Sequence, residues 1–308
     1  MEIFDRVYSR LLYVVAVFVL LSFLPQSVQA KGQYAQINGT QIYYEVEGEG
    51  HPLVFIHGYS LDLRMWDDQM PVFTKKYRVI RYDRRGFGKS SGVEQTYNAD
   101  AEDLYKLLKH LKITSCYVLG MSQGGGAALY FALRYPQMVD ALILQDTGVE
   151  GFRWPRNPKH IKTKSLREIA RTEGLEKAKE VWLQYPLFEV SRKKPEVFRK
   201  LREIIKDYPG KSLLRPHPPQ SESLDKSKAK QAIDRLNEIQ APTLVILGEF
   251  ESIGMHAVAD ALTYGIPNAE KVVIPGAGHM ANMDEPNAFN TTLLQFLEKL
   301  DRKRSQQK

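Results

Sequence analysis

The residues of this chain best suited to chemistry are Ser122 and the glycines on either side of it. Residues 120–124 read Gly-Met-Ser-Gln-Gly, after the apolar run 116–119 and before a stretch typical of a helix, 125–133. Strand, G-x-S-x-G and helix, in this order, predict a nucleophile elbow, which exposes a serine hydroxyl at the carboxyl end of a strand. The turn is so tight that side chains larger than hydrogen at positions 120 and 124 would collide with neighbouring backbone. Ser122 is therefore the predicted nucleophile.

A carboxylate and a histidine that could serve this serine follow it in the chain. Glu249 and Glu251 come shortly after the predicted strand 242–248, and His279 lies on a glycine-rich loop after the predicted strand 271–274. Beside a nucleophilic serine, a histidine can take the serine proton, and a carboxylate can fix the imidazole tautomer and stabilise the imidazolium. His279 and a carboxylate after the strand 242–248 could therefore act together with Ser122.

In these residues and in several further motifs, the chain resembles the α/β-hydrolase fold family, over nearly all of residues 33 to 300. The resemblance rests on the elbow, on His57-Gly58 after the apolar run 53–56, on the loop from Tyr82 to Ser90, and on Gly276-Ala277-Gly278-His279. Within the family the chain looks closest to the esterase, enol-lactonase and non-haem haloperoxidase-like branch. The resemblance implies an α/β fold, with a mostly parallel eight-stranded sheet flanked by helices and a helical cap inserted between strands 6 and 7.

The resemblance implies that Ser122 is the nucleophile, His279 the general base and Glu251 the acid that orients it. In such relatives the acid is usually an aspartate three residues after the strand-end glycine, and here Glu251 holds that position. Glutamate serves in some members, although its extra methylene needs a slightly different backbone placement. Two alternatives remain. Glu249 is nearer to the strand, where its side chain is expected to point away from the site, and Asp146 follows the predicted strand 141–145, an end from which some members draw their acid.

By the same resemblance, the backbone amides of Tyr59 and Gln123 form an oxyanion hole. Preorganised N–H groups stabilise the negative charge that develops on a carbonyl oxygen, and losing one donor typically costs about 10²–10³ in rate. His57, next to this loop, is interpreted as a structural histidine hydrogen-bonded within it rather than as a base.

The alternation of predicted strands and helices breaks after Thr147, and no clear strand follows until Gln240. Several proline-interrupted helices are expected there, so we predict a signal peptide (1–30), a first part of the core (31–147), a cap (148–240), a second part of the core (241–300) and a basic tail (301–308). In the cap, Trp182, Tyr185 and Phe188 gather around a proline. We expect them to line an apolar acyl pocket; plain packing of cap against core is the alternative.

Charge is concentrated in the predicted cap. Residues 148–240 hold 22 Lys and Arg against 13 Asp and Glu, a net charge of +9, whereas the whole chain carries +7. A basic cap could attract anionic substrates or associate weakly with an anionic membrane surface; a solvated lysine-rich surface is the alternative. Aromatic and basic residues do not alternate in a way that indicates nucleic-acid binding.

Several other motifs are not expected to be functional. Gly88-Lys89-Ser90 looks like the end of a phosphate-binding loop, but the glycine that this loop needs at position 83 is Asp83, which argues against nucleotide binding. The seven histidines show no spacing suited to zinc. We therefore expect neither a metal nor a cofactor. Cys116, the single cysteine, is predicted to be a core residue, and it has no partner for a disulfide within the chain.

The N-terminus has the pattern of a targeting segment. Arg6 and Arg10 precede the apolar run 11–24, and small residues lead up to Ala30. This pattern predicts a secretory signal cleaved after Ala30, and therefore a secreted or periplasmic protein. An uncleaved membrane anchor through residues 11–28 is the alternative.

Taken together, the sequence predicts a hydrolase that cleaves a small-molecule carboxylic ester or lactone through an acyl-enzyme intermediate. At 308 residues, 43% of them hydrophobic, the chain can bury one α/β core and an insertion. Serine at position 122 excludes relatives with an aspartate nucleophile. Carbon–carbon bond hydrolases and perhydrolases, which share the same three residue types, remain alternatives, as does a ligand-sensing protein with slow or no turnover.

Overall fold

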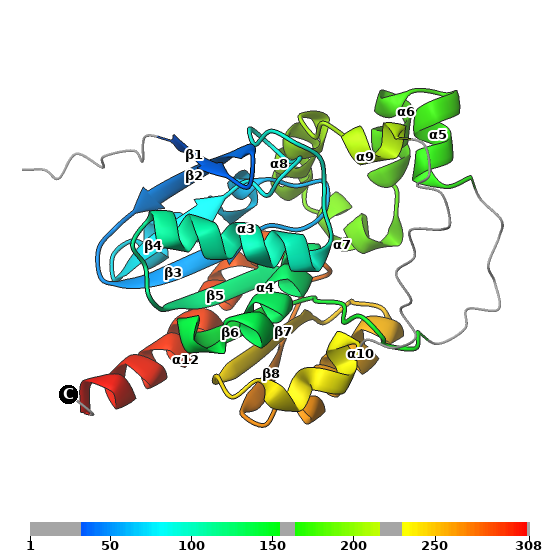
Figure 1. Cartoon of the computed structure of the whole chain (residues 1–308). Coiled ribbons are helices and arrows are strands. Elements are labelled where there is room, and N and C mark those ends of the chain that lie inside the picture. Colours follow the sequence, from blue (N-terminus) through cyan, green and yellow to red (C-terminus); the bar gives the residue numbers. More distant parts are fainter. Residues whose placement is uncertain (1–31, 155–163, 216–229, 307–308) are drawn as a thin grey trace, which may run out of the picture. The chain divides into compact units, whose positions relative to one another are not determined.

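The computed structural model describes residues 32–154, 164–215 and 230–306 (Figure 1). These residues belong to one compact unit, Gly32–Lys308. The predicted signal peptide, residues 1–30, lies outside the described residues, so its cleavage stays a prediction. None of the helices described is long and apolar enough for a membrane span.

An eight-stranded sheet forms the centre of the fold. Its strands are β1 (Gln33–Ile37), β2 (Thr40–Glu47), β3 (His51–Ile56), β4 (Tyr77–Tyr82), β5 (Cys116–Met121), β6 (Val139–Gln145), β7 (Thr243–Gly248) and β8 (Ala269–Ile274). Their order in space is β1-β2-β4-β3-β5-β6-β7-β8. The β1–β2 and β2–β4 pairs are antiparallel and the other pairs are parallel. The predicted fold, a mostly parallel eight-stranded sheet, is confirmed.

A tight hairpin opens the sheet. Asn38 and Gly39 connect β1 to β2 with φ values of 50° and 72°. Two-residue hairpin turns of type I′ need positive φ at both central positions, and Asn-Gly is the pair that adopts them most readily.

Helices cover both faces of the sheet. Over one face lie α3 (Tyr97–His110), α4 (Gln123–Arg134) and α10 (Ile253–Gly265), and over the other lie η1 (Leu63–Trp66), α2 (Met70–Phe73) and α12 (Pro286–Gln306). Alternate side chains of a strand point to opposite faces, so in β3 Val54 and Ile56 pack with the first set of helices and Leu53 and Phe55 with the second. The central strands are thus buried on both faces, which explains their continuous apolar sequences.

The predicted helical cap lies between β6 and β7. Its described helices are α5 (Leu166–Thr172), α6 (Leu175–Trp182), η3 (Pro186–Phe188), α7 (Glu189–Arg192), α8 (Pro195–Lys206) and α9 (Lys211–Leu214). A further helix, η5 (Ala232–Glu238), falls within the predicted cap boundaries but packs Ala232 and Leu236 into the core cluster that α10 shares. Two short helices, η2 (Pro136–Met138) and α11 (Ala281–Asp284), precede β6 and α12.

The end of the chain differs from the sequence-based expectation of a basic tail from residue 301. Helix α12 continues to Gln306. The reason is Asp301, whose two carboxylate oxygens accept hydrogen bonds from the Tyr77 and Tyr117 hydroxyls at 2.7 Å each. These tyrosines come from β4 and β5, so the last turns of the helix are bound to the sheet.

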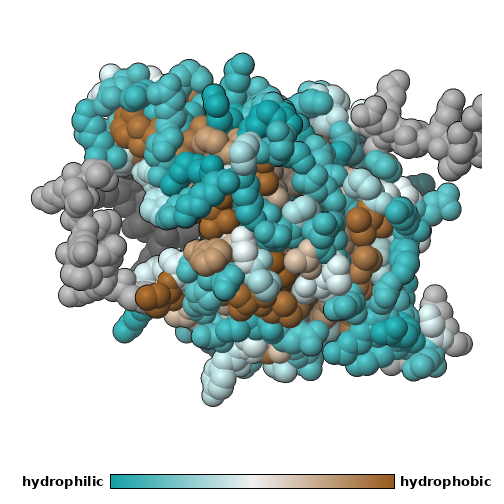
Figure 2. Space-filling model, turned by 180° about the vertical axis from the view of Figure 1, so that it is seen from behind, coloured by the Kyte–Doolittle hydropathy of each residue, from teal (hydrophilic) through white to brown (hydrophobic). Residues whose placement is uncertain are grey.

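The face of the molecule seen in Figure 2 is mostly hydrophilic, with apolar residues in separate patches. Large apolar side chains with more than half of their area exposed include Phe250, Ile253 and Tyr264. Singly exposed apolar side chains are common on soluble proteins.

Candidate active site

Ser122 occupies the sharp turn between β5 and α4. Its backbone has φ 52° and ψ −116°, a conformation that a non-glycine residue keeps only where the surrounding structure holds it. Here two hydrogen bonds hold it: the Ser122 N–H donates to the Gln145 carbonyl at 2.8 Å, and the Gly126 N–H donates to the Ser122 carbonyl at 3.1 Å. The backbone of Ser122 is therefore held in place at the start of α4.

The glycines of the turn allow α4 to approach the sheet closely. A Cβ on Gly120 would lie 2.3 Å from the Gly124 carbonyl oxygen, and a Cβ on Gly124 would lie 2.3 Å from the His57 carbonyl oxygen. Non-bonded atoms do not come this close, so the steric reason inferred for glycine at both positions is confirmed.

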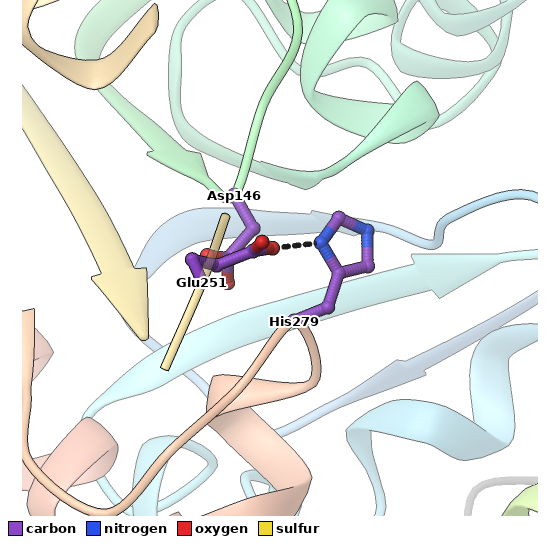
Figure 3. Close-up of side chains that lie close together, drawn as sticks. All are labelled: Asp146, Glu251 and His279. Atoms are coloured by element: carbon purple, nitrogen blue, oxygen red, sulfur yellow. Dashed lines mark hydrogen bonds and ion pairs between the residues drawn. The ribbon is translucent and has the colours of Figure 1, made fainter. Parts of the chain in front are cut away.

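The structure brings Ser122, His279 and Glu251 together. The Ser122 hydroxyl lies 3.1 Å from His279 Nε2. On the other side of the ring, His279 Nδ1 is hydrogen-bonded to a Glu251 carboxylate oxygen, the contact drawn in Figure 3. Glu251 follows β7, and its other oxygen accepts a hydrogen bond from the Ser252 N–H at 2.9 Å. The serine, the histidine and the glutamate thus form one chain of hydrogen bonds across three loops at the carboxyl edge of the sheet.

The charges of this group depend on one another. The side chains of His279 and Glu251 are only 13% and 7% exposed. Burial by itself would lower the pKa of His279, but the hydrogen bond and the charge of Glu251 outweigh burial and raise that pKa above its ordinary value. Burial would likewise raise the pKa of Glu251, and the bond to His279 lowers it instead. Each partner therefore favours the charged form of the other.

Asp146, the alternative acid, lies beside this pair without joining it (Figure 3). Its Oδ1 accepts a hydrogen bond from the Gly248 N–H at 3.1 Å, and its buried Oδ2 has no partner among the described residues. Burial raises the pKa of Asp146 well above its ordinary value, which favours the neutral carboxyl group. Glu251, rather than Asp146, is therefore the charged carboxylate that bonds to His279.

Glu249, the other alternative, is not the carboxylate that bonds to His279. Its carboxylate accepts a hydrogen bond from the Gly276 N–H at 2.8 Å, so it helps to hold the loop that carries the histidine.

In the described part of the chain, three residues are close enough together to bind a metal ion: Asp146, Glu251 and His279, whose ligand-type atoms all lie within 4.8 Å of one another. The His279 Nδ1, which such an ion would need as a ligand, already bonds to Glu251. The expectation that the protein binds no metal stays a prediction.

His57 is a structural histidine, as its sequence context suggests. Its Nε2 accepts a hydrogen bond from the Arg84 N–H at 2.9 Å, so its Nδ1 carries the proton and donates to the Gly58 carbonyl at 2.8 Å. Complete burial, together with the charge of Arg84, lowers the pKa of His57 well below its usual range. Both ring nitrogens are occupied, which leaves this histidine no role as a base.

The predicted oxyanion-hole residues flank Ser122. Gln123 is the first residue of α4, where backbone N–H groups lack partners within the helix. Tyr59 shares a cavity wall with Ser122 and His279. Over the described ranges neither backbone amide donates a hydrogen bond to another group of the protein, so both are available to an anionic oxygen.

A small cavity, called the inner cavity here, opens at Ser122. Its volume is about 50 Å³, and besides Ser122, Tyr59 and His279 its wall consists of Leu61, Met121, Trp182, Leu187, Phe188 and Met280. Two of the three predicted cap residues, Trp182 and Phe188, thus line it. Tyr185 does not, because its ring packs against Trp182 with ring centres 4.9 Å apart.

A second and much larger cavity, the outer cavity, adjoins the first. It measures about 1010 Å³ and reaches His279 and Glu251 but not Ser122. Its apolar wall is made of Pro186, Leu187, Val190, Phe250 and Met255. Leu187 and His279 belong to both walls, so they stand between the two cavities.

The sequence model of the alpha/beta hydrolase fold matches residues 51–286, most of the chain. The protein belongs to the α/β-hydrolase family. A hydrolase of 2-hydroxy-6-oxononadienedioate and 2-hydroxy-6-oxononatrienedioate from Paraburkholderia phymatum is 31% identical over 87% of this chain and 96% of its own. The 3-oxoadipate enol-lactonase 2 of Acinetobacter baylyi is 28% identical over 77% of this chain and 85% of its own.

Solved structures give the same assignment. A thermophilic esterase from Thermogutta terrifontis with malate bound superposes with a TM-score of 0.71 at 29% identity, covering 88% of this chain and 99% of that one. This α/β hydrolase is therefore similar in sequence or fold to proteins named as a lactonase, an esterase and a hydrolase of an oxo-dienedioate.

Sequence reasoning did not find Arg84, whose side chain is 1% exposed and bonds to the Gly58 carbonyl, next to Tyr59. The loop from Tyr82 to Ser90 was singled out as a family motif, but nothing in the sequence separates a buried Arg84 from the neighbouring Arg85. Most of the apolar wall of the inner cavity was also missed, because apolar residues at loop positions look the same whether they line a cavity or fill a core.

Proposed function

We propose that this α/β hydrolase cleaves carboxylic esters or lactones through an acyl-enzyme intermediate. The observation that carries the proposal is the chain of hydrogen bonds from Ser122 through His279 to Glu251, built on a strained elbow at the edge of an apolar cavity. A serine hydroxyl is a weak nucleophile, and an adjacent base that is itself oriented by a third group activates it.

In this mechanism Ser122 Oγ attacks the carbonyl carbon while His279 Nε2 takes the serine proton. The carboxylate of Glu251 stabilises the imidazolium that forms. The amides of Tyr59 and Gln123 bind the oxygen that becomes negative. His279 then gives the proton to the leaving alcohol, and a water molecule repeats the sequence to release the acid and restore the serine.

A fluorophosphonate probe and a panel of substrates test the proposal. Such probes react covalently with an activated serine, so mass spectrometry should find the label on Ser122 of the wild-type protein and no label after Ser122→Ala. The same preparation should hydrolyse p-nitrophenyl esters or simple lactones with saturation kinetics. Absence of both labelling and turnover in folded protein would refute an ester hydrolase and leave the ligand-sensing alternative.

Carbon–carbon bond hydrolysis is the second candidate, supported by the 31% identical relative named for an oxo-dienedioate. That reaction needs the same residue types but a substrate with a vinylogous ketone. Comparing kcat/KM for a p-nitrophenyl ester with kcat/KM for a 2-hydroxy-6-oxo-dienoate separates the two candidate functions. The substrate class with the much higher kcat/KM identifies the reaction.

We also propose that the protein is exported and cleaved after Ala30, or else anchored through residues 11–28. The support is the sequence pattern of two arginines, an apolar run and small residues before Ala30. Weak association of the basic cap with anionic membranes belongs to this proposal and is tested by sedimentation with vesicles of anionic and of neutral lipid.

A further inference from the structure

The two cavities divide a bound ester into an acyl side and an alcohol side. After attack the acyl group is bonded to Ser122, which, of the two cavities formed by the described residues, borders the inner one. The leaving oxygen must take its proton from His279, which also reaches the outer cavity. The alcohol portion therefore extends past His279 and Leu187 into the outer cavity.

The inner cavity limits the length of the acyl group. About 10–15 Å³ of such space holds one water molecule, so a cavity of about 50 Å³ holds roughly four non-hydrogen atoms. We propose that the substrates are esters of short acyl groups, of about two to four carbons, with large and mainly apolar alcohols. This proposal rests on the proposed function and names the substrate class of the same site.

The wall that sets this limit is held in place. Trp182 comes from the cap, and its Nε1–H donates to the Ser60 hydroxyl at 2.7 Å. Ser60 is fully buried and follows Tyr59, the residue predicted to donate one N–H to the oxyanion. The indole also packs edge-to-face on Phe188, with ring centres 5.5 Å apart. A longer acyl chain would have to displace a hydrogen-bonded tryptophan.

The outer cavity suits an uncharged alcohol because its charged groups are already paired. Lys194 bonds to Glu285 and to two backbone carbonyls. Glu249 bonds to the Gly276 N–H and Glu251 to His279, while Lys193 forms an exposed pair with Glu189. The exposed surface left for a ligand is largely that of the apolar side chains.

The test measures kcat/KM for p-nitrophenyl acetate, butyrate, octanoate and dodecanoate, and for the acetates of methanol, benzyl alcohol and 2-naphthylmethanol, whose leaving groups are all alkoxides. We expect the wild type to prefer acetate or butyrate by at least tenfold over octanoate, and to accept 2-naphthylmethyl acetate at least as well as methyl acetate. Trp182→Ala should reverse the acyl preference, because each methylene buried in the enlarged cavity improves binding about fourfold. Trp154→Ala, the same change at a half-exposed tryptophan outside both cavities, is the control and should keep the wild-type preference.

The outcomes separate this inference from the proposed function. Octanoate or dodecanoate as the best wild-type substrates, with Ser122 still labelled by fluorophosphonate, would overturn the short-acyl assignment alone. An unchanged preference in folded Trp182→Ala would also overturn it. Loss of labelling and of all turnover would instead refute the hydrolase proposal, and this inference with it.

A separate observation concerns Arg84, a buried guanidinium that touches both parts of the predicted oxyanion hole. Its Nη1 donates to Asp100 at 2.7 Å. Its Nη2 donates to the Gln123 side-chain oxygen at 2.6 Å and to the Gly58 carbonyl oxygen at 3.3 Å. One planar cation thus links helix α3, the first residue of α4 and the loop after β3.

The Gly58 carbonyl belongs to the same peptide unit as the Tyr59 N–H. It accepts two hydrogen bonds, from Arg84 Nη2 and from His57 Nδ1. In a trans peptide the C=O and N–H bonds point in opposite directions, so fixing the carbonyl fixes the direction of the N–H. A hydrogen bond to the carbonyl also polarises the peptide and makes its N–H a stronger donor. We infer that Arg84 is a positioning residue that orients and strengthens the oxyanion hole.

Arg85 supplies a matched control for this inference. It lies on the same loop and pairs with Asp103, one turn along α3 from Asp100, but its other contacts are to the β1–β2 hairpin. Arg84→Lys should lower kcat about 10- to 100-fold with little change in KM, because one oxyanion donor is weakened rather than lost. Arg85→Lys should lower thermal stability and leave kcat within about twofold.

A second readout separates positioning from plain structural support. A trifluoromethyl ketone inhibitor forms the tetrahedral oxyanion on Ser122, so its affinity should fall by the same factor as kcat in Arg84→Lys. If Arg84→Lys does not fold, a double variant that carries both Arg84→Gln and Asp100→Asn replaces it. The double variant removes both buried charges together and so leaves no unpaired carboxylate. The same loss of kcat is expected. Full kcat in either folded variant, or a loss matched by Arg85→Lys, would overturn the inference.

Discussion

Replacing Glu251 by glutamine is the most direct test of how the site works. Glutamine keeps the size of the side chain but removes the charge that balances a protonated His279. Its amide can also donate to Nδ1 and so hold the ring in the tautomer that cannot accept the serine proton. The Ser252 N–H, which bonds to Glu251, keeps an acceptor in the amide oxygen, so the fold should survive.

The size of the effect follows from the burial of the pair. Opposite unit charges about 4 Å apart at an effective dielectric constant of about 20 attract by about 4 kcal/mol. A hydrogen bond to a charged group adds about 1.5 kcal/mol at the lower end of its usual range. About 5.5 kcal/mol of lost transition-state stabilisation corresponds to roughly 10⁴ in rate. This equals the scale found when a triad carboxylate is changed to its amide, so we expect kcat to fall by about 10⁴.

The pH profile gives an independent check. Only neutral His279 can accept the serine proton, so activity rises with pH through the pKa of His279. Glu251 raises that pKa above its ordinary 6.5, which places the acid limb of the wild-type profile above pH 6.5. Without the carboxylate, burial dominates and lowers the pKa of His279, so the limb of Glu251→Gln should move to lower pH while the maximum falls.

Asp146→Asn is the matched control. Asparagine tolerates the positive φ of 45° at this position and can still accept from the Gly248 N–H. Because Asp146 has no hydrogen bond to His279, its change should cost at most about tenfold in kcat. Stopped-flow or steady-state ester hydrolysis measures both variants; a larger loss for Asp146→Asn than for Glu251→Gln would show that the acid has been misassigned.

Other predictions are simpler to check. Ser122→Ala should keep the circular dichroism spectrum and lose about 10³–10⁶ in kcat. Gly124→Ala should lose at least about 2 kcal/mol of unfolding free energy in urea melts, because its methyl group meets two backbone carbonyls. Gly148→Ala, where a Cβ meets nothing closer than 3.9 Å, should be neutral by the same measure. Material exported by the producing cell should begin at residue 31 by intact-mass analysis, whereas an anchored form would keep residues 1–30 and sediment with membranes. EDTA should leave ester turnover unchanged, since no metal is expected.

Short-range patterns explain why much of this fold could be predicted. The hairpin at Asn38-Gly39 and the elbow at Ser122 are local: positive φ and close backbone contacts restrict the residue types, so the sequence carries the signal. The buried parallel strands are recognisable for a similar reason, because both of their faces need apolar residues.

The parts that could not be predicted depend on side-chain directions between distant segments. Glu251 and Asp146 both follow neighbouring parallel strands, and only the path of the chain after each strand decides which carboxylate reaches His279. The burial of Arg84 and the binding of Asp301 to two tyrosines are of the same kind. Each involves partners many residues apart that share no periodic pattern.

The contacts between the cap and the core have a consequence for the cooperativity of unfolding. Polar contacts join the described cap to the core at well-separated points: Trp182 with Ser60, Ser191 with Asp284, Lys200 with Asp68, and Tyr208 with Glu94. Leu201 and Ile205 of α8 also belong to the same apolar cluster as β3 and α12. No single hinge releases all of these contacts, so cap and core should melt together in one calorimetric transition. A cap transferred from a relative would then require changes of the matching core residues as well, because one of the two residues in each contact belongs to the core.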